Sequence, residues 1–293
     1  MGRRALNRFS ESPSLRPRAE RVEGSNPGQP LRRLTRAALG CFVASLLAMT
    51  AIPLVAHAQT TKLDEIIQRG TLRVGLTGDY RPFSIKAEDG SFSGLDVDQA
   101  QSLAAGLGVK LEIVPTTWPT LMSDLQAGKF DVGMGGITET LERAKTAFFS
   151  TPVMRSGKTP IARCADKGRY ETLADIDKPD VKVITNPGGT NEKFDRAHLH
   201  AAQIIVFPSN AQIFDELAAG HADVMITDGV ETRLQQKLHP GVLCAIHPDA
   251  PFDTSELGYL LPRDIALKLF VDLWISQSQE TGRWQAELTK WLE

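Results

Sequence analysis

The order of apolar segments along the chain constrains the fold most strongly, because short strand-like runs alternate with amphipathic helix-like runs. The predicted strands cover residues 71–76, 110–115, 130–134, 181–185, 203–207 and 222–226. The predicted helices cover residues 63–69, 96–107, 121–127, 211–219, 231–238 and 266–292. This alternation is typical of an α/β fold in which parallel sheets carry helices on both faces.

Length and charge narrow the function classes. The 293 residues suggest about two domains. Removing the nine arginines and three glutamates of residues 1–58 from the totals leaves 24 basic and 32 acidic side chains, a net charge of −8. An acidic body argues against nucleic acid as a partner. The three cysteines form no C-x-x-C pair or Cys/His cluster, so we expect no structural metal site.

The N-terminal region predicts export. Arg32, Arg33 and Arg36 precede an apolar run over residues 37–55, and the run ends in Ala-His-Ala at residues 56–58. A membrane anchor is the alternative, because the run nears spanning length. The small residues and the A-x-A ending favour a cleaved signal peptide over residues 31–58 and a periplasmic protein that starts at residue 59. Residues 1–30 fit no signal and represent either a disordered extension or a mis-set translation start.

Cys164 and Cys244 are the cysteines that remain after the predicted cleavage. Disulfides persist outside the cytoplasm. The two side chains therefore either form a disulfide or stay as separate buried thiols, and the sequence leaves both alternatives open.

Ligands of open α/β sheets bind beyond the carboxyl ends of the strands, so the segments that follow the predicted strands are the candidate sites. Residues 78–83 follow the first strand, and we expect Tyr80 to contact a ligand, whereas Phe83 suits either ligand contact or packing. Trp118 follows the second strand. Its ring suits either the wall of a cleft or the core.

The third segment, residues 135–143, contains two glycines, a helix-capping threonine and Arg143. Thr140 is a suitable helix N-cap, which places Arg143 in the first helical turn, where a cation opposes the helix dipole. A guanidinium there suits a carboxylate ligand. The alternative is a solvated arginine paired with Glu139 or Glu142.

The fourth segment, residues 186–192, is a glycine-rich loop that opens a helix and offers free N–H groups to an anion. Thr190 and Asn191 add side-chain donors. The loop lacks the Lys-Ser/Thr ending of a nucleotide-binding P-loop. We expect Glu192 to cap the helix rather than to act in catalysis.

The fifth segment, residues 227–231, places Asp228 and Glu231 at the spacing of a helix capping box, which is the interpretation that spacing alone favours. The alternative puts two carboxylates at the mouth of a cleft, where one binds an amine and the other is a general acid.

Together these segments resemble the amino-acid-binding periplasmic solute-binding proteins, through residues 78–83, the Thr138-x-Thr140-x-x-Arg143 motif, the Gly-Gly-Thr190 loop and Asp228. Residues 77–83, 155–161, 186–194 (NPGGTNEKF) and 227–235 are similar to an enzymatic branch of that superfamily, the periplasmic cyclohexadienyl dehydratases.

The resemblance implies a type II periplasmic-binding-protein fold, with two Rossmann-like lobes joined at a hinge. Lobe 1 would span residues 59–156 and 253–293, and lobe 2 residues 157–252. The implied enzyme is a carbon-oxygen lyase that converts prephenate to phenylpyruvate and arogenate to phenylalanine without metal or organic cofactor. The alternative is the solute-binding subunit of an amino-acid ABC transporter, with a permease as partner.

The resemblance also assigns roles to single residues. Thr138, Arg143 and Thr190 would hold a substrate carboxylate, Asp228 the amino group of arogenate, and Glu231 would protonate the departing hydroxyl. The other residues expected to bind substrate are Tyr80, Trp118, Lys158, Asn186, Gly189 and Asn191.

Overall fold

The computed structural model describes residues 60–292, within one compact unit of the chain. The predicted signal peptide and residues 1–30 lie outside the described residues. Within residues 60–292, no helix combines the length and the apolar character needed to cross a bilayer.

The first five-stranded sheet has the order β5-β1-β6-β15-β7. Its strands are β1 (Thr71–Leu76), β5 (Lys110–Pro115), β6 (Val132–Gly133), β7 (Phe148–Phe149) and β15 (Leu260–Leu261). β1 pairs in parallel with β5, from Thr71 opposite Lys110 to Leu76 opposite Pro115. β15 lies between β6 and β7 and runs antiparallel to both. The first lobe therefore needs a strand from the far end of the chain.

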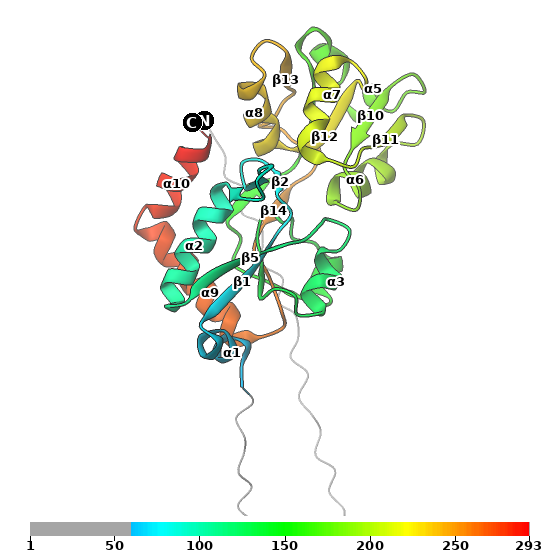
Figure 1. Cartoon of the computed structure of the whole chain (residues 1–293). Helices are drawn as coiled ribbons and strands as arrows, with labels where there is room; N and C mark the ends of the chain where they lie inside the picture. Colours follow the sequence, from blue (N-terminus) through cyan, green and yellow to red (C-terminus); the bar gives the residue numbers. More distant parts are fainter. Residues whose placement is uncertain (1–59, 293) are drawn as a thin grey trace, which may run out of the picture. The chain divides into compact units, whose positions relative to one another are not determined.

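Helices cover both faces of this sheet. On one face Leu72, Val74 and Leu76 of β1 pack with residues of α1 (Lys62–Arg69), α2 (Leu95–Leu107), α9 (Ile265–Glu280) and α10 (Arg283–Leu292). Figure 1 shows α9 and α10 beside α2. On the other face α3 (Leu121–Gln126) packs on Phe130. The single helical region expected over 266–292 is interrupted at Gly282, whose φ of 74° ends the first helix.

The second five-stranded sheet has the order β11-β10-β12-β9-β13. Its strands are β9 (Lys158–Arg163), β10 (Lys182–Thr185), β11 (Gln203–Val206), β12 (Val224–Asp228) and β13 (Leu243–Ala245). The helices of this lobe are α5 (Leu173–Ile176), α6 (Thr190–His198), α7 (Ile213–Ala219) and α8 (Gly229–Leu238). Side chains of β12 alternate between two cores, so Val224 and Ile226 face one core and Met225 the other.

The predicted parallel pairing occurs in both sheets, but each sheet also contains antiparallel pairs and is therefore mixed. β9 runs antiparallel to β12 and β13. Its sequence contains Pro160, which has no N–H to donate to the ladder and argues against a central strand. In the folded chain the carbonyl of Pro160 still accepts a hydrogen bond from the Ile246 N–H at 2.9 Å.

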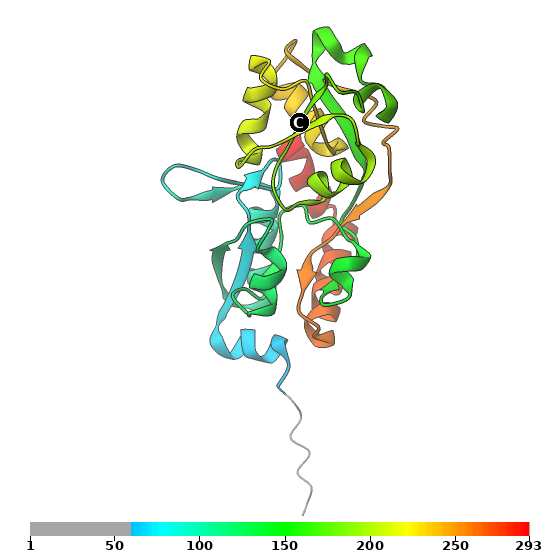
Figure 2. The same cartoon turned by 90° about the vertical axis from the view of Figure 1, so that its right-hand side faces the viewer.

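Two short strands connect the lobes. β8 (Met154–Ser156) pairs antiparallel with β14 (Ser255–Leu257), and both views show β14 passing between the lobes (Figures 1 and 2). Next to this pair, a Cβ on Gly157 would lie 2.2 Å from the carbonyl oxygen of Asp253, so only glycine fits there. The boundaries predicted after residues 156 and 252 lie close to these strands and remain predictions.

The remaining short elements lie near the cleft and in the connections. They are the three-stranded sheet of β2 (Asp79–Tyr80), β3 (Ser84–Lys86) and β4 (Phe92–Ser93), helix α4 (Leu141–Ala144), and two 3-10 helices (Cys164–Arg169 and Asn210–Gln212).

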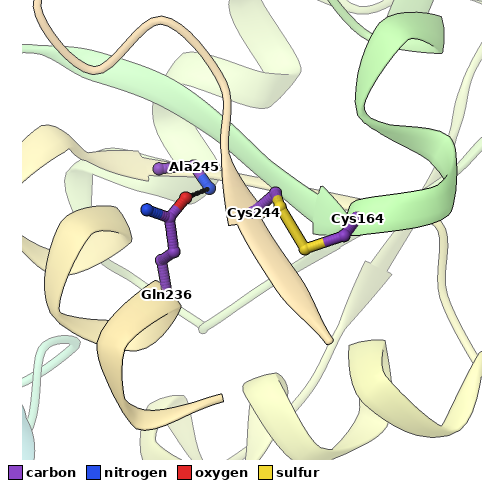
Figure 3. The surroundings of a disulfide bond; sticks show 4 residues. All are labelled: Cys164, Gln236, Cys244 and Ala245. Carbon is purple, nitrogen blue, oxygen red and sulfur yellow. Dashed lines mark hydrogen bonds between the residues drawn. A yellow bond between two sulfur atoms is a disulfide. The ribbon is translucent and has the colours of Figure 1, made fainter. Parts of the chain in front are cut away.

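Cys164 and Cys244 form a disulfide, with their Cα atoms 4.8 Å apart (Figure 3). The bond joins the end of β9 to the edge strand β13. The N–H of Ala245 donates to the Gln236 side chain at 2.9 Å, which also ties β13 to α8. This edge strand is therefore held by a covalent bond and by a helix, as well as by its ladder.

Candidate active site

A cavity between the lobes collects most of the predicted site residues. Its volume is about 20 Å³, room for about one water molecule. It lies where β10 and β12 end and where the loop after β6 begins, as expected for an α/β fold. The predicted residues that line it are Tyr80, Trp118, Thr138, Asn186, Gly189, Thr190, Asn191, Asp228 and Glu231.

Lys158 lies behind this cavity and connects three residues that line it. Its ammonium Nζ donates to Asp228 at 2.9 Å, to the Asn191 side chain at 2.5 Å and to Thr190 Oγ1 at 3.1 Å. Only 2 % of the residue is exposed. Lys158 is thus a buried cation whose charge is compensated by Asp228.

Arg143 lies beside the cavity but does not line it. Thr140 caps α4 as expected and accepts a hydrogen bond from the Arg143 N–H at 3.2 Å. The buried guanidinium donates to the Thr138 carbonyl at 2.7 Å, and burial lowers the pKa of Arg143. The alternative of a solvated ion pair is not seen among residues 60–292, because Glu142 pairs with Lys193 at 2.6 Å.

Glu231 lies in the first turn of α8 and is 1 % exposed. Its carboxyl group accepts hydrogen bonds from Thr227 Oγ1 at 2.7 Å and from Asn210 Nδ2 at 3.1 Å. The capping box favoured by spacing is wrong, because the Asp228 side chain makes no cap bond to α8. Asp228 instead accepts from Tyr80 and Lys158, both distant in sequence.

The surroundings of Glu231 favour its neutral form. Burial raises the pKa of Glu231 well above its ordinary value, and the Asp228 and Asp79 carboxylates act in the same direction. The hydrogen bond from Thr227 and the charge of Lys158 oppose this shift. A carboxyl group that keeps its proton at higher pH suits proton donation.

Aromatic side chains form one wall of the cavity. The Tyr80 ring meets Trp118 edge-on at 5.9 Å and packs on Phe83 at 4.9 Å. Trp118 Nε1 donates to the Asp79 carboxylate at 3.0 Å. Phe83 is buried in the packing below Tyr80 and does not line the cavity.

The glycine-rich loop opens α6 as predicted. The Gly188 N–H donates to the Glu192 carboxylate at 2.7 Å, which confirms Glu192 as a capping residue. This bond and the ion pair with Arg196 lower the pKa of Glu192, so it is poorly suited to proton donation. A Cβ on Gly188 would lie 2.7 Å from Pro119 Cγ of the other lobe, so glycine allows the lobes to approach closely here.

Sequence reasoning missed one residue that lines the cavity, Asn210. Gly136, one of the two glycines in the 135–143 segment, also lines the cavity. Asn210 follows β11, so the rule that sites follow strand ends contained the signal for it. Thr227 and Asp79, which bond to or lie near Glu231, were also not singled out.

Direct hydrogen bonds between the lobes close the cavity. Tyr80 Oη donates to Asp228 at 2.6 Å, Asn210 Nδ2 to the Asp79 carbonyl at 3.1 Å, and the hydroxyls of Thr138 and Thr190 are 3.2 Å apart. A substrate must therefore replace part of this network. In the described part of the chain, no group of three or more side chains is arranged to hold a metal ion.

The family model of the bacterial extracellular solute-binding proteins, family 3, matches residues 72–293. The chain belongs to this family. The two-lobed α/β fold expected from the sequence is confirmed by solved structures of such proteins. The family is one of bacterial extracellular proteins, which agrees with the predicted export.

The chain has relatives among enzymes and among amino-acid-binding proteins. It is 50% identical to cyclohexadienyl dehydratase of Pseudomonas aeruginosa, over 87% of this chain and 93% of the relative. It is 30% identical to an L-cystine-binding protein of Escherichia coli, over 84% and 94% of the two chains.

Two solved structures extend the comparison. An ancestral amino acid-binding protein described as a precursor of cyclohexadienyl dehydratase has a TM-score of 0.74 and 38% identity, covering 80% of this chain and 100% of that one. An ancestral cyclohexadienyl dehydratase has a TM-score of 0.52 and 54% identity, covering 80% and 98%.

Proposed function

We propose that this protein is a periplasmic cyclohexadienyl dehydratase, which converts prephenate to phenylpyruvate and arogenate to phenylalanine. The 50% identity to the Pseudomonas aeruginosa enzyme over most of both chains supports this function. The observation that carries the proposal is the environment of Glu231. Its buried carboxyl group lines the ligand cavity, and among residues 60–292 no cation is bonded to it. Burial also raises the pKa of this carboxyl group.

The reaction requires one proton donor. The carbon-oxygen bond of the ring hydroxyl breaks, its electron pair stays on oxygen, and the oxygen takes the Glu231 proton and leaves as water. The bond from the opposite ring carbon to its carboxylate breaks, carbon dioxide leaves, and that electron pair completes the aromatic ring. Glu231 ends each turnover as a carboxylate and must take up a proton before the next.

The other polar groups bind the substrate. The Thr190–Asn191 end of the loop, with Lys158 behind it, holds one carboxylate. Thr138 and Arg143 hold the other, because the Arg143 guanidinium already lies against the Thr138 backbone. Asp228 binds the amino group of arogenate. With prephenate, which has a keto group at that position, Asp228 keeps its hydrogen bonds from Tyr80 and Lys158.

Closure of the lobes on the substrate excludes water and places Glu231 beside the leaving hydroxyl. The predicted signal peptide would deliver the enzyme to the periplasm. A receptor role in amino-acid transport is the second candidate and has support from the cystine-binding relative. It has less support, because a receptor that releases its ligand unchanged has no use for a buried, neutral Glu231.

The test is a turnover assay with protein expressed from the full-length gene and purified from the periplasm of the host. Prephenate and arogenate are added separately, and phenylpyruvate and phenylalanine are measured against a blank without enzyme. We expect product with both substrates. Glu231→Gln should lower kcat by roughly 10²-fold or more, as expected for loss of a general acid, while phenylpyruvate still binds.

Glu192→Gln is the matched control, because the Glu192 carboxylate accepts a hydrogen bond from the Gly188 N–H in the neighbouring loop and does not line the cavity. It should keep most of the activity. Full activity of Glu231→Gln would assign the proton to another group. Absence of any product, together with tight binding of a common amino acid, would make the protein a receptor.

A further inference from the structure

Asn210 is a polar side chain that lines the cavity and bonds directly to Glu231, and the proposed function gives it no task. It begins a 3-10 helix after β11 and is 2 % exposed. Its Nδ2 donates to Glu231 Oε1 at 3.1 Å and to the Asp79 carbonyl oxygen at 3.1 Å. These two acceptors take both amide hydrogens, which fixes which end of the amide is nitrogen and which is oxygen.

The other end of this amide is a buried acceptor. Asn210 Oδ1 has no hydrogen-bond partner within residues 60–292. Leaving such an oxygen unpaired in a buried place is unfavourable, and native proteins bury few unpaired polar atoms. Because Asn210 lines the cavity, a ligand group that donates a hydrogen bond would satisfy its Oδ1 atom.

The chemistry of the substrates identifies that group, on the basis of the proposed function. With both carboxylates ionised, prephenate carries a single hydrogen-bond donor, its ring hydroxyl. Arogenate carries the same hydroxyl and an ammonium group, for which Asp228 is the counter-ion. We propose that Asn210 Oδ1 accepts a hydrogen bond from the ring hydroxyl of the substrate, while the N–H groups of the same amide hold Glu231 and Asp79.

This contact prepares the hydroxyl for departure. When the hydroxyl donates its own hydrogen to Asn210, its oxygen becomes more basic and a lone pair is free to face Glu231. The oxygen then takes the Glu231 proton as its bond to the ring carbon breaks, and it leaves as water. Asn210 thus contacts the leaving group and its acid at the same time.

The contact also depends on closure of the lobes. Asp79 belongs to the first lobe, whereas Asn210 and Glu231 belong to the second. The Asp79 carbonyl occupies one amide hydrogen only when the lobes are together. The amide is therefore oriented toward the hydroxyl in the closed enzyme.

The test compares kcat of Asn210→Ala on both substrates in protein expressed from the full-length gene. Because both substrates share the ring hydroxyl, we expect kcat to fall by the same factor with each, about 10- to 100-fold for a lost hydrogen bond to a group that develops charge. The dissociation constant of phenylpyruvate, which lacks the hydroxyl, should rise by a smaller factor than kcat falls, because only the Asn210–Asp79 bond between the closed lobes is lost there. Asp228→Asn is the comparator and should change the ratio of the two activities.

A second variant and a control complete the design. Asn210→Asp is nearly isosteric and also loses the donor to Glu231, so in both variants the pKa of Glu231 rises and the alkaline limb of kcat moves to higher pH. Gln212→Ala changes an exposed residue of the same 3-10 helix and should leave kcat unchanged.

Three results would overturn the assignment. They are an unchanged kcat in Asn210→Ala, unequal losses on the two substrates, and a rise in the phenylpyruvate dissociation constant as large as the fall in kcat, which would make Asn210 only a structural contact of the closed lobes. An alkaline limb that stays in place in Asn210→Asp would equally remove its link to Glu231. Absence of turnover in the unmodified protein would instead overturn the proposed function, and this assignment with it.

Discussion

The phenol hydroxyl of Tyr80 donates a 2.6 Å hydrogen bond to the carboxylate of Asp228 across the cleft. The two residues are 148 positions apart in sequence and belong to different lobes. Asp228 also accepts from Lys158 at 2.9 Å, so its charge stays compensated when the tyrosine moves away. The Tyr80–Asp228 bond therefore stabilises the closed arrangement, while the Lys158–Asp228 pair belongs to the second lobe in any arrangement.

Tyr80→Phe should shift the ligand-free protein toward the open arrangement. Hydrogen bonds to charged groups contribute about 1.5–3 kcal/mol, which corresponds to a shift of roughly tenfold or more in the equilibrium between closed and open lobes. Small-angle scattering should detect this as a larger radius of gyration. Tyr170→Phe is the control, because Tyr170 is buried in the second lobe away from the cleft. Equal radii for the two variants would contradict the role of Tyr80.

The pH dependence of kcat should report the protonation of Glu231. Catalysis needs the protonated acid, and burial raises the pKa of Glu231, so kcat should be constant at low pH and fall about tenfold per pH unit above that pKa. Thr227→Val removes a hydrogen bond that favours the carboxylate. The pKa should then rise further, and the alkaline limb should move to higher pH.

Thr232→Val is the matched control for this profile. Thr232 is also buried on α8, but its hydroxyl donates to the Gly229 carbonyl rather than to Glu231. The alkaline limb of the kcat–pH profile of Thr232→Val should coincide with that of the unmodified enzyme. A limb that moves to lower pH in Thr227→Val would show that another group sets the profile.

Asp195 should make the protein less stable as the pH rises. The side chain is fully buried, its carboxyl oxygens have no hydrogen-bond partner within residues 60–292, and burial raises its pKa to about 8. In the unfolded chain the pKa is about 3.9. Between these values the folded state holds a proton that the unfolded state lacks, so the free energy of unfolding falls from about pH 4 toward pH 8.

Asp195→Asn should remove this part of the pH dependence. At pH 8 the variant should melt at a higher temperature than the unmodified protein, by roughly 2–4 °C for each kcal/mol recovered. Below pH 4 the two proteins should melt alike. Asp180→Asn, at an exposed position, should leave the dependence of the melting temperature on pH unchanged. A parallel pH dependence in Asp195→Asn would assign the effect to another buried group, such as Asp96, whose pKa is raised to about 6.

Reduction of the disulfide should destabilise the second lobe. Cys164 and Cys244 are separated by 80 positions, and closing a loop of that length in the unfolded chain contributes about 4.5 kcal/mol on the chain-entropy estimate. We expect calorimetry with and without reductant to show a lower melting temperature in the reduced protein. The Cys164→Ser/Cys244→Ser double variant should melt like the reduced protein and should no longer respond to reductant.

The sequence pattern predicted those strands that a regular spacing of apolar residues marks within the segment itself. The strands at 71–76 and 110–115 occur with the predicted bounds, since apolar residues at alternate positions and the preceding glycines identify them. β9 was not predicted, because its sequence contains Pro160 and Lys158, two residue types that are unusual in a buried strand inside a sheet. What stabilises β9 is pairing with β12 and β13, and that depends on residues more than 60 positions away.

In the candidate site, too, local sequence predicted some residues, whereas the roles of others depend on distant partners. Strand-end positions led to nine of the residues that line the cavity. The capping box failed as a prediction, because spacing within residues 228–231 contains no information about Tyr80 or Lys158, which take the Asp228 carboxylate instead. Asn210 has no motif around it. Its importance depends on two partners, Asp79 and Glu231, that only the folded chain brings within reach.

The place of β15 between β6 and β7 has a consequence for how the chain is made. The first sheet stays divided until Leu260 and Leu261 have been synthesised, whereas the strands of the second sheet all lie within one uninterrupted stretch, residues 158–245. A ribosome or a translocation channel that delivers the chain from its N-terminus therefore releases the last part of the first lobe after the whole of the second. A chain that stops before residue 260 would hold the carboxyl groups of Asp228 and Glu231 on a completed lobe, while the first lobe is still unfinished.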